Sequence, residues 1–511
     1  MRQHDAEALR RLDFIPFPDE LVQVKREFTA YAREQGLDPG DIIFDFLSSS
    51  QISEVASYDG FPGRYPHWRF GMAFDQVSKS REWGLSTIYE MVINNRPAYA
   101  YLLQGSMPVV QRMVIAHVLG HCDFFRHNAW FSGTDKNMLN EMANHAGRVK
   151  RYANRYGFER VERFLDTCLS LENLVDPNLL FVRKPPKKES ATRGRGDAEK
   201  ETEDEFDRLR FTSPYVASYA RGARAATAPK AKADAPEVLA LKPFPERPTR
   251  AALDFLVDSA PLEDWERDIL EIVRGEAYYF LPQRLTKIMN EGWAVFWHTR
   301  IMVARGLSPS DLTQYADENS KIISAWRGRL NPYRLGYMLF EDIRDRWDKG
   351  RHGAEYDSCQ DRRRRDSWDT HERKGMDKVF EVRAAFDDAQ FVDAFLTPEF
   401  VTKGELFTFR HHAREGSDVI ESRDFEKVKQ ALLAHIANGG EPVLEVTDGN
   451  YQNRSELYVK HVHGGVDLKI PEARQTLHAL FGVWRRPVNL ETAVQGKPKT
   501  YRYDGSTDGE A

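Results

Sequence analysis

Three short stretches of the chain place metal-ligand side chains at helical spacing. On an α-helix, residues three, four or seven positions apart lie on one face, so each stretch can direct two ligands at one interior point. Histidine and glutamate are common ligands of divalent metal ions. A helical body that brings these stretches together would hold a metal ion. The stretches are His117 and His121 in AHVLGHCDFF, Glu141 and His145 in NEMANHAGR, and Glu291 and His298 in NEGWAVFWH.

The pair His117 and His121 lies among apolar neighbours, including Val114, Ile115 and Val118, which indicate burial. A buried imidazole needs a metal ion or a carboxylate as partner, because unsatisfied polar nitrogens are costly inside a protein. The alternative is a pair of histidines that only form hydrogen bonds within a core.

The stretch around Glu291 supplies a third ligand. Asn290-Glu291-Gly292-Trp293-Ala294 resembles the NExFA-type helix that carries the third zinc ligand of gluzincin peptidases. In those enzymes the other two ligands come from an H-E-x-x-H motif, whose glutamate is the general base. Here Val118 follows His117, so that base is missing. The pattern predicts a metal site without conventional peptidase chemistry, in which Glu141 is the replacement acid or base.

The remaining candidates allow more than one arrangement. Glu291 and His298 are separated by about 10 Å along a helix axis, so a mononuclear site does not easily use both. One of them is then an orienting partner, or the site holds two metal ions, as in dinuclear iron or manganese bundles. Zinc is the first choice of metal, with iron and manganese as alternatives. The predicted ligands are His117, His121, Glu291, His145 and His298.

Composition describes an ordinary globular protein. The chain has 511 residues, of which 41% are hydrophobic and 30% charged, enough for a large core and for two or three domains. The net charge of -5 arises from 73 basic and 78 acidic residues, which gives no global field for nucleic acid. The sequence contains neither a secretory signal nor an apolar run long enough to span a membrane. We therefore expect a cytoplasmic protein without nucleic-acid partners.

The elements that must position the ligands are mainly helices. Apolar periodicity and end signals predict helices over residues 19–35, from Pro108 to about His127, from Thr134 or Asp135 to Tyr156, and over 283–305. Residues 184–240 are rich in Ala, Lys, Glu and Pro and are predicted to be a disordered tether. Near the carboxyl end, PVLEVTD and SELYVKHVH are predicted strands around a turn at residues 448–450, followed by a helix in PEARQTLHALFGVW and a strand in RPVNLETAV.

The expected fold is therefore a multi-helix body with a small C-terminal α+β domain and an internal low-complexity tether. Its predicted parts are a first half of the helical body at 1–183, the tether at 184–240, a second half at 241–405 and the α+β domain at 406–511.

Several longer runs carry a family resemblance. The chain resembles the SpoVR family, the stage V sporulation protein R family, in nearly its whole length outside the tether. It departs from the family's pattern at Leu119 and His127. The runs are YDGFPGRYPHWRFGM (58–72), IYEMVINNRPAYAYLL (88–103), AHVLGHCDFF, MANHAGR, LPQRLTKIMNEGWAVFWH, NPYRLGYMLFEDI (331–343) and VFEVR with FLTPEF (379–400).

The resemblance implies a biological setting. The family is linked to formation of the spore cortex and also occurs in bacteria that do not sporulate, which suggests a stress response. Its members commonly accompany a PrkA-type AAA+ serine kinase and a von Willebrand-A-like (VWA-like) protein.

Two main functions are compatible with the sequence, and a dinuclear oxidase is a further alternative. The first is a metal-dependent hydrolase or amide-modifying enzyme acting on a cell-wall-related amide or peptide. The second is a non-catalytic regulatory protein that binds the PrkA-type kinase and the VWA-like protein and uses its metal or polar core only for structure.

Overall fold

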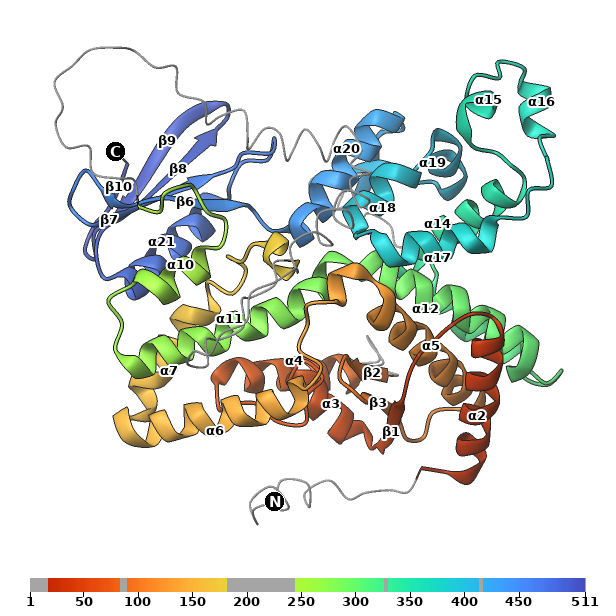
Figure 1. The fold of residues 1–511 in the computed structure, drawn as a ribbon, viewed down its shortest axis with the longest axis horizontal. Helices are drawn as coiled ribbons and strands as arrows, with labels where there is room; N and C mark the ends of the chain where they lie inside the picture. The colour runs from red at the N-terminus through yellow and green to blue at the C-terminus, as the bar shows by residue number, and fades with distance from the viewer. Residues whose placement is uncertain (1–16, 83–89, 182–243, 326–329, 413–416, 511) are drawn as a thin grey trace, which may run out of the picture. The chain divides into compact units, whose positions relative to one another are not determined.

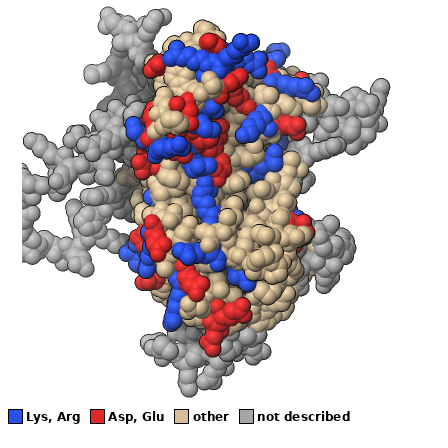
Figure 2. Space-filling view, turned by 90° about the vertical axis from the view of Figure 1, so that its right-hand side faces the viewer, with Lys and Arg blue, Asp and Glu red and all other residues tan. Residues whose placement is uncertain are grey.

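The computed structural model describes residues 17–82, 90–181, 244–325, 330–412 and 417–510. Helices dominate these residues, and small β-sheets accompany them, so the predicted fold class is confirmed (Figure 1). The predicted tether at 184–240 lies outside the described residues. None of the described helices combines the length with the apolar character that a membrane crossing requires. On the face drawn in Figure 2, basic and acidic side chains are interspersed, as the near balance of charges would suggest.

The chain divides into two compact units, and the two interleave along the sequence. The first unit comprises residues 1–155, 286–386 and 397–421, and the second comprises 156–285, 387–396 and 422–511.

The described helices and strands of the first unit are α2 (Asp19–Glu34), β1 (Ile42–Leu47), α3 (Ser49–Ser57), α4 (Trp68–Glu82), β2 (Glu90–Ile93), β3 (Ala98–Leu103), α5 (Pro108–His127), η1 (Ala129–Phe131), α6 (Met138–Tyr156), α12 (Lys287–Ile301), the π-helix η3 (Met302–Gly306), α13 (Leu312–Ile322), α14 (Pro332–Asp348), α15 (Gly353–Asp357), α16 (Arg362–Asp366), α17 (Gly375–Ala385), α19 (Pro398–Gly404), β4 (Thr408–His412) and β5 (Ser417–Ser422).

The described elements of the second unit are α7 (Phe158–Leu169), η2 (Pro177–Leu180), α10 (Ala252–Ser259), α11 (Asp264–Leu285), α18 (Asp388–Phe395), α20 (Phe425–Ile436), η4 (Ala437–Gly440), β6 (Leu444–Tyr451), β7 (Glu456–His461), α21 (Ile470–Trp484), β8 (Val488–Val494), β9 (Lys497–Tyr503) and β10 (Asp508–Glu510).

Three helices form the centre of the first unit. Helix α12 packs against both α5 and α14. The contacts are so close that glycine is required at them: a Cβ atom on Gly120 of α5 would lie 2.8 Å from the Cα atom of Ala294 on α12. In the same way, a Cβ atom on Gly292 of α12 would overlap the backbone of Gly336 on α14. Backbone contact at these glycines brings α5, α12 and α14 together.

A small sheet that the sequence did not predict lies in the first unit. Its order is β1-β3-β2, with β1 parallel and β2 antiparallel to β3. The strands are only four to six residues long, and apolar runs of that length do not distinguish a buried strand from a helix segment. Strands β2 and β3 contact α5, so the sheet supports the helix that carries the two histidines.

The second unit contains a five-stranded sheet of order β10-β9-β8-β7-β6. Strands β7 and β8 are parallel, and α21 forms the crossover between them. The predicted turn at residues 448–450 is wrong, because the register shifts in the β6–β7 pairing let β6 continue to Tyr451. The chain reverses just beyond, where Gln452, Asn453 and Ser455 have positive φ angles. Strands β9 and β10 were not predicted.

Candidate metal centre

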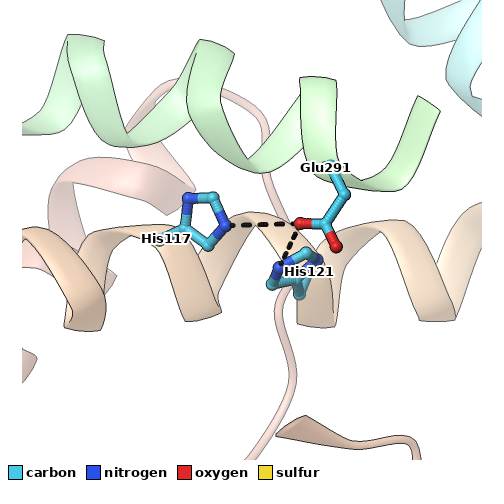
Figure 3. A group of neighbouring side chains, drawn as sticks. All are labelled: His117, His121 and Glu291. Atoms are coloured by element: carbon cyan, nitrogen blue, oxygen red, sulfur yellow. Dashed lines mark ion pairs between the residues drawn. The ribbon is translucent and has the colours of Figure 1, made fainter. Parts of the chain in front are cut away.

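The structure brings together three of the predicted ligands, His117 and His121 from α5 and Glu291 from α12. One potential ligand atom of each lies within 4.8 Å of the other two. The Oε2 atom of Glu291 is 3.8 Å from Nε2 of His117 and 3.5 Å from Nε2 of His121. Figure 3 shows both imidazoles directed at the same carboxylate oxygen, which lies between the two helices. Among the described residues, no other group of three or more His, Cys, Asp or Glu side chains has its potential ligand atoms this close together.

A neighbouring asparagine orients His121. The Oδ1 atom of Asn290 lies 2.9 Å from Nδ1 of His121. Because an amide oxygen only accepts, Nδ1 carries the proton and donates it to Asn290. The lone pair of His121 is then on Nε2, the nitrogen that faces Glu291. Metal-bound histidines are commonly held by a hydrogen bond of this kind from the opposite ring nitrogen.

Two hydrogen-bonded side chains, His298 and Asn319, orient His117 in a similar way. The Oδ1 atom of Asn319 accepts a hydrogen bond from Nε2 of His298 at 2.8 Å. Burial, with a smaller effect of His117, lowers the pKa of His298 to about 3, so this imidazole is neutral and carries one proton. Its Nδ1 atom therefore accepts from Nδ1 of His117, 2.8 Å away. The lone pair of His117 is left on Nε2, facing Glu291.

The carboxylate of Glu291 completes the group. Its Oε2 atom is buried and has no hydrogen-bond partner among the described residues. Burial raises the pKa of Glu291, and His121, Lys287 and a hydrogen bond with Tyr333 act in the opposite direction. The ring of Tyr333 also stacks on His117, with centroids 6.3 Å apart. A carboxylate oxygen faced by two nitrogen lone pairs requires a proton or a cation between them.

The distances suit a metal ion. Zinc bonds to nitrogen and oxygen ligands are about 2.0–2.2 Å long, so two ligands at a tetrahedral angle are about 3.4 Å apart. The observed separations between the carboxylate oxygen and the two imidazole nitrogens, 3.5 and 3.8 Å, exceed this value by about 0.1 and 0.4 Å. Small side-chain rotations about His117 and Glu291 would close that difference. The residues therefore fit a divalent ion of the zinc type.

The other predicted site residues lie elsewhere. His298 directs its two ring nitrogens to His117 and Asn319 and so orients a ligand rather than joining the group. Glu141 and His145 are carried by α6, whereas α12 packs chiefly on α5 and α14. The structure does not bring Glu141 or His145 into the group, so a catalytic role for Glu141 and a ligand role for His145 stay predictions without geometric support.

A buried ionic network lies half a turn beyond His121. Asp123 is fully buried, and its carboxylate accepts hydrogen bonds from Trp293 Nε1 at 2.9 Å, Arg383 Nη1 at 2.7 Å and the backbone N–H of Asp38 at 2.8 Å. Burial alone would raise the pKa of Asp123, but the hydrogen bond of His127 and the charge of Arg383 keep it below its ordinary value. The network joins α5, α12 and α17 and limits movement of the histidine-bearing helix.

Sequence reasoning did not single out two of the residues that surround the ligands. Tyr333 lies in NPYRLGYMLFEDI, one of the runs that carry the family resemblance, and its place in that run could have indicated a role at the site. Asn319 has no such signal, because only tertiary packing places it beside His298.

Comparisons with known proteins agree with the resemblance. The model of the family described as "SpoVR like protein" matches residues 17–441. The chain belongs to the SpoVR family. It is also 28% identical over 485 residues to "Uncharacterized protein YcgB" of Escherichia coli (strain K12), with 89% of each chain covered. No solved structure matches the chain. The SpoVR match includes α5 and α12, the two helices that carry the three candidate ligands.

Proposed function

We propose that this SpoVR-family protein binds one divalent metal ion through His117, His121 and Glu291, with zinc as the first choice and iron or manganese as alternatives. The observation that carries the proposal is the buried Oε2 atom of Glu291, which lacks a hydrogen-bond partner among the described residues and is faced by the lone pairs of two Nε2 atoms. Two histidines and one glutamate leave a fourth position open, and this is the donor pattern of catalytic rather than structural zinc.

The corresponding activity is that of a metal-dependent hydrolase or amide-modifying enzyme in the cytoplasm. When bound, the ion would polarise a carbonyl group and lower the pKa of water. Asn290 and the His298–Asn319 pair hold the two imidazoles, and Tyr333 holds the carboxylate of Glu291. The SpoVR link to sporulation and the spore cortex, or to a stress response, points to a cell-wall-related amide or peptide as substrate.

A non-catalytic regulatory protein is the second candidate function. Its partners would be the PrkA-type AAA+ serine kinase and the VWA-like protein that accompany the SpoVR family. This alternative is favoured by the group as the described residues form it, which holds one carboxylate: Val118 follows His117, and Glu141 does not join the group. In this case the ion would only stabilise the contact between α5 and α12.

The decisive experiment is elemental mass spectrometry of protein purified without an affinity tag or chelator. We expect close to one metal ion per chain in the wild type and a loss of that metal in both His117→Ala and Glu291→Gln. His435→Ala, which removes an exposed histidine on α20, is the matched control and should retain the metal. Wild-type protein without metal would refute the metal centre and favour the regulatory function.

A second measurement separates the two functions once metal is present. Release of amines from a panel of wall-derived amides, dependent on His117 and Glu291, would support the enzyme. A metal-loaded protein without such activity, whose stability falls when the metal is removed, would support the regulatory function.

A further inference from the structure

The second unit contains a cavity of about 410 Å³, none of whose lining residues belongs to the proposed metal centre. Its walls come from the end of α20 and from η4, from the connecting segments 441–443 and 462–469, from β6, β7 and β8, and from the first turns of α21. The apolar lining includes Val443, Leu444, Leu468, Ala473 and Leu490. A volume of this size falls within the range of about 300–1,000 Å³ that is typical of small-molecule sites. Most of the lining lies beyond residue 441, where the SpoVR match ends.

The charged groups of the lining are mainly acidic. Three carboxylates, those of Glu441, Asp467 and Glu472, accompany one ammonium group, that of Lys469. Asp467 is already engaged, because its two oxygens accept hydrogen bonds from His463 Nε2 and from the backbone N–H of residue 495, each at 2.8 Å.

The available negative charge is therefore on the glutamates. Glu441 is near enough to Arg284 to influence its pKa, so part of its charge is compensated. Glu472 stands exposed on the first turn of α21 and makes no ion pair with a described residue. A cation entering the cavity would meet this carboxylate.

One neutral polar side chain lies deeper in the lining. His461 is 6% exposed, and its Nδ1 atom lies 2.9 Å from Oγ1 of Thr492. Either partner of this hydrogen bond can be its donor, so the bond holds the ring in place without fixing its tautomer. Burial is the main reason why the pKa of His461 falls to about 4. An uncharged imidazole does not repel a cation.

We propose that this cavity binds a small primary amine with an apolar body. The ammonium group pairs with Glu472 at the rim, and the apolar body packs against Leu444, Leu468 and Leu490. The acidic excess of the lining disfavours a carboxylate ligand, and the apolar walls disfavour a ligand without a hydrocarbon body.

The test uses three probes with one carbon skeleton, 2-phenylethylamine, 2-phenylethanol and phenylacetate, titrated into the full chain and followed by calorimetry or saturation-transfer NMR. We expect the amine to bind about two- to five-fold more tightly than the alcohol, the range for an ion pair at an exposed rim. Phenylacetate should bind most weakly. A higher salt concentration should reduce the ratio of the affinity for the amine to that for the alcohol.

Three variants test where the probes bind and how much of the affinity for the amine comes from its charge. Glu472→Gln should lower the affinity for the amine to that for the alcohol and leave the alcohol unchanged. Glu426→Gln, on the exposed surface of α20 and outside the lining, is the matched control and should change nothing. Thr476→Phe places a ring in the cavity from a half-buried position and should abolish binding of the amine and the alcohol. Equal affinities for amine and alcohol, tighter binding of phenylacetate, or no binding of any probe would each overturn the proposal.

Discussion

Substitution of Gly336 by alanine tests whether close helix contact builds the metal centre. Gly336 lies on α14 at its contact with α12, opposite Gly292, the residue that follows Glu291. A Cβ atom there would overlap the carbonyl oxygen of Ile288 and lie 2.8 Å from the Cα atom of Gly292, whereas ordinary contacts begin near 3.4 Å. Both obstacles are backbone atoms, which cannot rotate away, so α12 and α14 must move apart.

The magnitude follows from two opposing effects. Overpacking against a rigid neighbour costs about 1–3 kcal/mol, and contact with backbone places this site near the upper value. Replacing glycine by alanine within a helix contributes about 1 kcal/mol in the stabilising direction. The net expectation for Gly336→Ala is a loss of about 2 kcal/mol, with a lower metal content because Glu291 and Tyr333 are displaced.

Gly147 provides a matched control in the same unit. It lies within α6, and a Cβ atom there would come no closer than 3.6 Å to a flexible group, Nη1 of Arg151. Gly147→Ala should therefore raise stability by about 0.5–1 kcal/mol. Hydrogen exchange of peptides from α12 and α14, together with urea unfolding and metal analysis, measures both variants. If Gly336→Ala matched Gly147→Ala in stability and in metal content, the argument from close packing would be refuted.

Three further changes have defined outcomes. Tyr333→Phe removes the hydrogen bond to Glu291 and should weaken metal binding about ten-fold in a chelator competition; unchanged affinity would contradict the assigned role. Asp123→Asn leaves the buried guanidinium of Arg383 without its counter-charge and should lower the free energy of unfolding by about 3–5 kcal/mol in urea, so a loss below about 1 kcal/mol would argue against the network. For His461, burial places the pKa near 4, below the value of about 6.5 in an unfolded chain. The unfolded state then binds the extra proton between these values, so stability should fall by about 3 kcal/mol from pH 6.5 to pH 4. The variant His461→Gln should have a flatter stability profile over this range, and an unchanged slope would assign the acid sensitivity to other groups.

Helices with strong end signals were predicted well from the sequence. The helix from Pro108 to His127 has the predicted bounds, since proline suits the first turn of a helix and an apolar run follows it. The helix predicted over 283–305 begins later, at Lys287, because α11 continues through Pro282 to Leu285. The short strands of the first unit were missed, because their apolar runs have no distinct periodicity.

The candidate site was predicted in its parts and not in its assembly. Spacing along one helix shows that His117 and His121 share a face, because helical geometry is local. The same reasoning left open whether His298 is a ligand or an orienting group. Its hydrogen bonds to His117 and Asn319 decide that point, and both partners come from other helices.

The sequence by itself determined the helical body, membership of the SpoVR family and the residue types available for a metal site. Only the tertiary structure decided that His117, His121 and Glu291 meet and that Glu141 and His145 do not join them. The physical reason is that distances between helices depend on packing, and here on glycines whose missing side chains allow backbone contact. The same packing sets the tautomers of the two histidines and leaves the Oε2 atom of Glu291 without a hydrogen-bond partner among the described residues. It does so because only the fold brings a partner such as Asn319 near.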